Sequence, residues 1–236
     1  GRLSGFGLKG QVDLVTVADQ ATEAHVRERL LSAFPGDSFL GEEGGAGPGG
    51  NEGPWRWIVD PLDGTTNFVH THPVFAVSIA LQYEGRTVYG CVHAPALRET
   101  FRAVAGAGAT LNGAPIRVSG TALVAESLLA TGAPYNRRDI VDSLLRPIRR
   151  AILNAHGLRR EGSAAMDLAW LAAGRLDGYS EEGLHAWDVA AGILLVEEAG
   201  GRVTSWDLGP HDLYRGPLLA SNGRIHDPLP RVLFEE

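Results

Sequence analysis

The stretch Trp57–His70 reads WIVDPLDGTTNFVH and is the most informative part of the chain. Its apolar start belongs to a strand expected over Trp55–Val59, which ends at Asp60 and Pro61. Asp63 follows three residues after Asp60. Because the ring of Pro61 fixes its own φ angle, the turn is held in a shape in which both carboxylates can point at one spot. The pattern indicates a place where two negative charges converge.

Two converging carboxylates suit a hard divalent cation, Mg²⁺ or Mn²⁺, whose remaining ligands can be phosphate oxygens. Phosphate would be repelled by bare carboxylates, so a cation is needed to reverse the local charge. Gly64 lets the backbone approach a ligand closely, and Thr65 begins an expected helix whose N-terminal N–H groups favour phosphate. A turn with two solvent-exposed aspartates explains the same residues, and the Asp-x-x-Asp pattern alone leaves both interpretations open.

Two further acidic segments favour a shared site. Glu42 and Glu43 lie between glycines, just before a Gly-rich stretch that is expected to form an irregular loop over Gly44–Pro54. The segment HAWD opens an otherwise apolar helix, in which Trp187 would be buried and would leave Asp188 directed outward. Asp188 alone is typical of a helix N-cap. Acidic residues at several structural junctions are less easily explained as separate caps and turns.

The composition is that of an ordinary folded protein. The chain has 236 residues, of which 44% are hydrophobic and 21% charged, and this length allows one large domain or two small ones with a sizeable core. Its single cysteine, Cys91, excludes a disulfide within the chain and a cysteine-cluster zinc site. A cytosolic setting fits this cysteine usage.

The charge balance limits the class of partner. A net charge of −7 argues against a protein that coats DNA or RNA. No apolar run approaches the ~18 residues of a membrane span, and Gly1–Gly10 is not a signal peptide. Lys9 is the only lysine, and no P-loop pattern surrounds it. We therefore expect neither a membrane nor a nucleic acid as partner.

Hydrophobic periodicity and turn signals predict interleaved helices and strands. Helices are expected over residues 16–34, 140–155, 163–173 and 188–199, and strands over residues 75–81, 87–93, 99–104, 114–118 and 202–206. Ser163 is expected to cap its helix, and Pro147 to kink another. The first four of these strands suggest an antiparallel meander, and the whole order predicts layered α and β packing.

Two long motifs carry a resemblance to a known family. WIVDPLDGTTNFVH resembles the first signature of the inositol monophosphatase family, and WDVAAGILLVEEAGG, Trp187–Gly201, resembles the second. DLVTVADQ, FLGEEG, EGSAAMDLAW and GYSEEGLHAWD follow the same family in order and approximate spacing. The resemblance covers the chain from Lys9 onward.

The resemblance implies a single domain over residues 1–236 with a layered α-β-α-β-α sandwich, of the inositol monophosphatase and fructose-1,6-bisphosphatase type. It also implies a cytoplasmic homodimer that hydrolyses a phosphate monoester with a Mg²⁺-activated water and is sensitive to lithium. Members of the family carry a helix before the segment where Lys9 falls. That helix is expected to be missing or truncated here.

The same resemblance implies the roles of individual residues. Glu42, Asp60 and the Leu62 carbonyl would hold a first metal ion, and Asp60, Asp63 and Asp188 a second, with Mn²⁺ as a possible substitute for Mg²⁺. Thr65 and Glu42 would orient the attacking water, and Asp19 would lie near that water and a weaker third ion. The expected phosphate and substrate contacts are Asp63, the N–H groups of Gly64 and Thr65, Gly162, Ser163, Ala164 and Glu181.

The substrate is expected to be a small phosphorylated polyol or sugar. The form DGTTNF resembles the inositol phosphate branch, so inositol 1-phosphate is the leading candidate. Fructose 1,6-bisphosphate, histidinol phosphate and 3′-phosphoadenosine 5′-phosphate are alternatives, because relatives act on each of them. A different class of function is a protein-binding role in transcription or ribosome maturation, which some bacterial relatives have.

Overall fold

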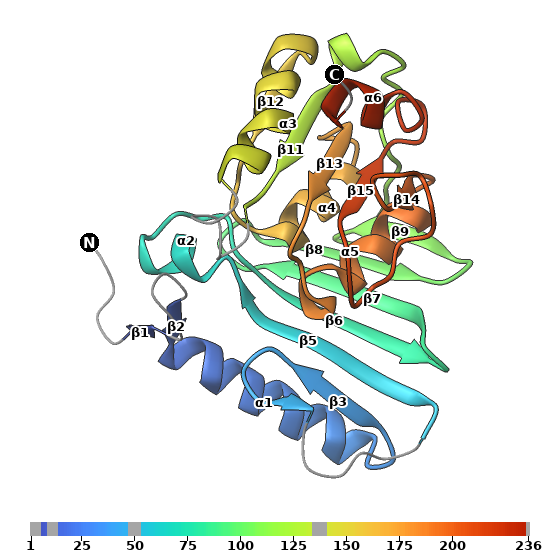
Figure 1. Cartoon of the computed structure of the whole chain (residues 1–236). Helices are drawn as coiled ribbons and strands as arrows, with labels where there is room; N and C mark the ends of the chain where they lie inside the picture. The colour runs from blue at the N-terminus through green and yellow to red at the C-terminus, as the bar shows by residue number, and fades with distance from the viewer. Residues whose placement is uncertain (1–5, 9–13, 47–52, 134–140, 235–236) are drawn as a thin grey trace.

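The computed structural model describes residues 6–8, 14–46, 53–133 and 141–234 of the chain (Figure 1). Lys9 and most of the Gly-rich stretch, residues 47–52, lie outside the described residues. The described part of that stretch, expected to be irregular, includes a short strand at Gly45–Ala46 that pairs with Leu40 and Gly41.

The larger sheet has eight strands in the order β10-β9-β8-β7-β6-β5-β3-β4. Their bounds are β3 (Ser38–Gly41), β4 (Gly45–Ala46), β5 (Trp55–Asp63), β6 (Ala76–Tyr83), β7 (Arg86–Ala94), β8 (Glu99–Val104), β9 (Gly108–Leu111) and β10 (Ala114–Pro115). Strands β5 to β10 pair antiparallel in chain order, which confirms the predicted meander, and β3 lies parallel to β5. The strand predicted over residues 114–118 is shorter, because it ends at Pro115.

The smaller sheet has five strands in the order β12-β11-β13-β15-β14. They are β11 (Leu128–Thr131), β12 (Gly157–Arg159), β13 (Gly178–Glu181), β14 (Arg202–Thr204) and β15 (Leu218–Ser221). Only β14 was predicted, and it ends at Thr204 rather than Trp206. A separate pair, β1 (Phe6–Leu8) and β2 (Leu14–Thr16), precedes the first helix.

Helices fill the layers outside and between the sheets. They are α1 (Val17–Ala33), α2 (Thr65–Val69), α3 (Val141–Asn154), α4 (Ala164–Ala172), α5 (Ala186–Glu198) and α6 (Leu229–Phe234), with a short 3₁₀ turn at Val124–Glu126. Figure 1 shows α4 and α5 between the two sheets, α1 on the outer side of the larger sheet, and α3 and α6 on the outer side of the smaller one. The predicted α-β-α-β-α sandwich is confirmed.

Strand β5 shows why the apolar run Trp57–Val59 is continuous rather than alternating. Successive side chains on a strand point to opposite faces. Trp57 and Val59 pack with the α1 residues Val26 and Leu30, whereas Ile58 joins the large core around α4 and α5. Because helices cover both faces of the strand, each position of the run is buried and favours an apolar residue.

The end of β5 corrects one prediction. The strand was expected to end at Val59, but it continues to Asp63. Asp60 pairs with Ser78 and Asp63 pairs with Ala76, so one extra residue is accommodated on β5. Pro61 has no N–H to give to a ladder, and a bulge is one of the few places where a strand tolerates proline. The bulge brings the two aspartates to the end of the strand without breaking the sheet.

No helix in the described ranges is both long and apolar enough to cross a membrane.

Candidate functional site

A cavity of about 360 Å³ opens where the end of β5 meets the first turns of α4 and α5 and the end of β13. Nearly all of the predicted site residues line it. They are Glu42, Asp60, Leu62, Asp63, Gly64, Thr65, Gly162, Ser163, Ala164, Glu181 and Asp188. Asp19 does not line the cavity but lies directly behind it, where its Oδ1 is 3.0 Å from the Thr65 hydroxyl. Segments far apart in the sequence therefore converge on one place, as predicted.

Asp60 is buried and is held by its own turn. Its Oδ1 accepts a hydrogen bond of 2.9 Å from the backbone N–H of Leu62, the short-range pattern by which an aspartate fixes a turn. The Leu62 carbonyl oxygen lies 3.0 Å from Thr65 Oγ1. The bulge thus gives the Asp60 carboxylate and the Leu62 carbonyl fixed positions beside each other.

Asp63 joins β5 to the start of α4. Its Oδ2 accepts hydrogen bonds from Ser163 Oγ at 2.6 Å and from the Ala165 N–H at 2.7 Å. Ser163 is the N-cap of α4, as predicted, and its Oγ accepts from the Met166 N–H. Burial, followed by the charge of Asp188, raises the Asp63 pKa to about 7 even though these hydrogen bonds lower it.

From the sequence alone Asp188 could be the N-cap of its helix, but in the structure it lies three residues after the N-cap. The N-cap of α5 is His185, and Asp188 is the third residue of the helix. Its Oδ2 accepts a hydrogen bond of 2.6 Å from the His185 backbone N–H. The His185 ring stacks on Trp187 with 4.7 Å between ring centroids, which fixes the helix start. Asp188 therefore caps the helix through its side chain and still lines the cavity.

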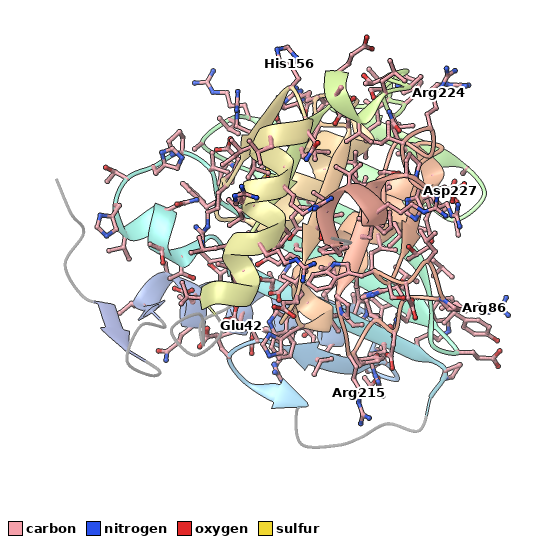
Figure 2. All side chains as sticks on the ribbon, turned by 45° about the horizontal axis from the view of Figure 1, so that its top comes forward. Glu42, Arg86, His156, Arg215, Arg224 and Asp227 are labelled. Carbon is pink, nitrogen blue, oxygen red and sulfur yellow. The ribbon has the colours of Figure 1, made fainter. Side chains whose placement is uncertain are left out.

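The acids at this end of the cavity interact through their charges. Burial raises the pKa of Asp60 well above its usual range, and the neighbouring charges of Glu42, Asp63 and Asp188 raise it further. Within the described residues, Arg160 is the only basic Lys or Arg side chain that lines the cavity. The labelled arginines Arg86, Arg215 and Arg224 point outward at the periphery of the molecule, away from Glu42 (Figure 2).

The donor set fits a hard divalent cation. Its members are carboxylate oxygens and a backbone carbonyl, which are the ligands that Mg²⁺ and Mn²⁺ prefer, and a cation would relieve the repulsion that raises the Asp60 pKa. No group of three or more His, Cys, Asp or Glu side chains within the described ranges already stands in the arrangement of ion ligands. The chemistry of the donors, and not their present spacing, is what favours a metal.

Gly64 and Asn67 shape the link between β5 and the next strand. Gly64 has a φ of 90°, and a Cβ there would lie 2.9 Å from the Val74 carbonyl oxygen, so the position requires glycine. Asn67 Nδ2 donates hydrogen bonds to the Val74 carbonyl at 2.7 Å and to the Glu161 carbonyl at 2.8 Å. The last of these bonds ties α2 to the segment that leads into α4.

A second wall of the cavity, which includes residues of α4 and β13, contains a residue that sequence reasoning missed, Asp167. It is 1% exposed, lines the cavity, and its Oδ1 has no hydrogen-bond partner among the described residues. Burial, followed by the charge of Glu181, raises its pKa well above the usual range. Glu181 Oε2 accepts a hydrogen bond from the Tyr179 hydroxyl at 2.5 Å, and burial raises the Glu181 pKa to about 7. An acid inside the apolar run AAMDLAWLA was the available signal.

Comparison with known proteins agrees with this geometry. Residues 3–233 match the inositol monophosphatase family. An inositol-1-monophosphatase from Synechocystis is 45% identical over 99% of this chain and 81% of its own length. The Nus factor SuhB of Pseudomonas aeruginosa is also 45% identical, over 94% of this chain and 83% of its own. The structure of inositol monophosphatase from Anabaena (Nostoc) superimposes with a TM-score of 0.90 at 47% identity, covering 94% of this chain and 87% of that one.

The fold and these relatives define the class as phosphoric monoester hydrolases, and the chain is an enzyme of that class. The chain belongs to the inositol monophosphatase family.

Proposed function

We propose that this enzyme uses Mg²⁺ to remove phosphate from a small phosphorylated polyol or sugar, with inositol 1-phosphate as the leading substrate. The observation that carries the proposal is the convergence of Glu42, Asp60, Asp63 and Asp188 on one cavity, with the Asp60 pKa raised by burial and further by the charges of the other three. A phosphate could not approach such a surface unless cations first reversed its charge.

The ligand assignment follows the resemblance and fits the chemistry of the donors. Glu42, Asp60 and the Leu62 carbonyl would hold one ion, and Asp60, Asp63 and Asp188 a second, with a weaker third near Asp19. Bound there, such ions would activate a water and stabilise charge on the attacking and leaving oxygens. Mn²⁺ is expected to substitute for Mg²⁺ because it accepts the same oxygen ligands.

The chain itself positions the water and the phosphate. The Thr65 hydroxyl has two acceptors at 3.0 Å, Asp19 Oδ1 and the Leu62 carbonyl. Its single proton is therefore engaged within the protein, and its lone pairs are left to accept a hydrogen bond from water. With Glu42 as the second acceptor, the water would be oriented toward the phosphorus atom. The N–H groups of Gly64 and Thr65 would hold the phosphate oxygens.

The second wall, with Asp167 and Glu181, supports a substrate that carries hydroxyl groups. Asp167 Oδ1 is a buried acceptor without a described partner, and leaving such a group unpaired is costly. Because the residue lines the cavity, a substrate hydroxyl would donate to the Asp167 carboxyl group, as Tyr179 donates to Glu181. Glu181, Gly162, Ser163 and Ala164 would contribute the other contacts to the polyol or sugar.

The relatives' names favour an inositol phosphate over the alternatives. The Synechocystis and Anabaena proteins are both named inositol monophosphatases. Fructose 1,6-bisphosphate, histidinol phosphate and 3′-phosphoadenosine 5′-phosphate remain alternative substrates for the same chemistry. We further propose that the enzyme is a homodimer that acts in the cytoplasm.

The test is phosphate release from these four compounds with and without Mg²⁺. Mg²⁺-dependent release led by inositol 1-phosphate supports the proposal, and release led by another compound reassigns the substrate. Absence of release from a folded, Mg²⁺-saturated protein would overturn it. Lithium is expected to inhibit the reaction, and this inhibition can be measured in the same assay.

A protein-binding role is a second candidate, favoured by the relative named Nus factor SuhB. Such a role would use surface residues and could coexist with the phosphatase. It predicts that an Asp60→Asn variant, inactive as a phosphatase, still co-purifies with transcription or ribosomal factors. If no transcription or ribosomal factor co-purifies from cell extract, the protein-binding role is wrong.

A further inference from the structure

Helix α1 has two buried acids on one face, and both contact segments that contribute residues to the cavity. Asp19 is 1% exposed and Glu23 is 4% exposed. Residues four apart lie on the same side of a helix, one above the other. Asp19 contacts Thr65, as described above. Glu23 was not predicted to have a role, and its contacts lie on the turn that carries Glu42.

The Glu23 carboxylate binds the backbone of that turn with both of its oxygens. Oε2 accepts a hydrogen bond of 2.8 Å from the Glu43 N–H, and Oε1 accepts one of 2.9 Å from the Gly44 N–H. Arg27 pairs with Glu23 at 3.2 Å and lies over the Phe39 ring, 4.3 Å from its centroid. Charge-assisted hydrogen bonds of this kind are about twice as strong as neutral ones.

The sequence of the turn is built around this carboxylate. A Cβ at Gly41 would lie 2.3 Å from Glu23 Oε2, and one at Gly44 would lie 2.8 Å from Glu23 Oε1. Glycine at these positions leaves room for the carboxylate, and the N–H groups of Glu43 and Gly44 supply its donors. Glu42 lies in this turn, between Gly41 and Gly44, and it lines the cavity.

We propose that Glu23 is a positioning residue for Glu42, so that α1 holds both members of the water-orienting pair, Thr65 through Asp19 and Glu42 through Glu23. The functional part rests on the proposed function, because it takes Glu42 as a metal ligand. Glu23 itself does not line the cavity and acts through the backbone of the turn. Groups that orient a metal ligand typically change metal affinity or activity by about 10–100-fold when they are removed.

The informative variant is Glu23→Gln, which keeps the shape of the side chain but replaces one acceptor with an N–H₂ donor facing a backbone N–H. Glu198→Gln is the matched control. Glu198 also accepts two backbone N–H groups, from Gly106 at 2.7 Å and Gly108 at 2.8 Å, but in a turn that does not line the cavity. Both variants are expected to lose thermal stability, Glu23→Gln the more, because Glu23 is buried and paired with Arg27 whereas Glu198 is half-buried.

The measurement is Mg²⁺ binding by calorimetry on the folded proteins, without substrate. Glu23→Gln is expected to weaken binding at the Glu42 site by about 10–100-fold, and Glu198→Gln to leave it within about twofold of wild type. In a Glu42→Gln background, Glu23→Gln is expected to cause little further loss, because coupled residues are not additive. If Glu23→Gln does not fold, Glu23→Asp takes its place. This variant keeps the charge and should weaken Mg²⁺ binding by an intermediate amount.

The outcomes separate the two proposals. If the wild-type protein binds Mg²⁺ and Glu23→Gln or Glu23→Asp binds it equally well, the positioning role is wrong and the proposed function stands. Equal weakening by Glu198→Gln, or a full additive loss in the Glu42→Gln background, would also overturn the positioning role. A folded wild-type protein that binds no Mg²⁺ would overturn both.

Discussion

The two walls of the cavity are made of the same residue type but are built differently. Asp60, Asp63 and Asp188 lie at the ends of elements, and each has at least one oxygen hydrogen-bonded to a backbone N–H. Asp167 is the fourth residue of α4, a helix that is buried on nearly every side, and has an oxygen without a described partner. The first wall is organised before any ligand binds, whereas the second has an acceptor that is not satisfied by the described residues. This difference suggests that the first wall performs the chemistry and the second selects the substrate.

The largest expected effect is on the first wall, with Asp60→Asn. Turnover should fall by about 10³-fold or more, the size of losing a major electrostatic stabiliser in an active site. The metal-free variant should be more thermally stable than wild type, because an amide removes a buried charge that Glu42, Asp63 and Asp188 repel. Initial rates and melting curves in EDTA measure the two effects. Wild-type turnover in this variant would exclude Asp60 as a metal ligand.

A smaller and more selective effect is expected on the second wall, with Asp167→Leu. The value of kcat/KM for inositol 1-phosphate should fall by about 10–100-fold, the range expected when a polar substrate group loses its buried partner. p-Nitrophenyl phosphate has no polyol hydroxyls, so its hydrolysis should change by less than about threefold if hydroxyl contacts are what the wall provides. Asp167→Asn keeps an acceptor and should be intermediate. Equal losses of kcat/KM on both substrates would show that Asp167 supports the fold and does not bind the substrate hydroxyls.

The contrast between the walls also explains what could be predicted from the sequence. Asp60, Asp63 and Asp188 stand beside Pro61, Gly64 and Trp187, residues that mark the ends of elements, so their convergence was visible in the pattern. An acid within an apolar helix was the only signal for Asp167, and Glu23 stands in a helix interior where no neighbouring residue marks the end of an element. Their roles arise from contacts between segments distant in the chain, such as Glu23 with Glu43 and Gly44.

The meander of the larger sheet was predictable for a similar reason, whereas most of the smaller sheet was not. The strands of the meander follow one another in the sequence with turn signals between them. Strands β11, β12 and β13 pair in parallel across long connections, with α3 and α4 between them. They have only three or four residues each, too few to show a period. Their pairing depends on tertiary packing rather than on local pattern.

The smallest expected effect is a pH dependence of stability that involves both walls. Asp63 on the first wall and Glu181 on the second each have a pKa raised to about 7 in the folded protein. An unfolded chain loses these protons near its ordinary carboxyl pKa, so between about pH 4 and 7 the folded state binds more protons. The metal-free protein should therefore become less stable as the pH rises through about 7.

Melting temperatures in EDTA between about pH 6.5 and 8 isolate this effect. His226 has the opposite sign, because burial lowers its pKa to about 4, but its contribution is lost mainly below its ordinary pKa of about 6.5. We expect the melting temperature to fall by at least about 2 °C across the window, the change that roughly 1 kcal/mol produces in a protein of this size. The double variant Asp63→Asn with Glu181→Gln should show a smaller slope than wild type, with a remainder from Asp60 and Asp167, whose pKa values are also raised. The slope of each single variant assigns the protons to one wall. A melting temperature that rises with pH would mean that neither carboxyl is held protonated. In that case the charge repulsion inferred for the first wall would not be the reason that the site requires a cation.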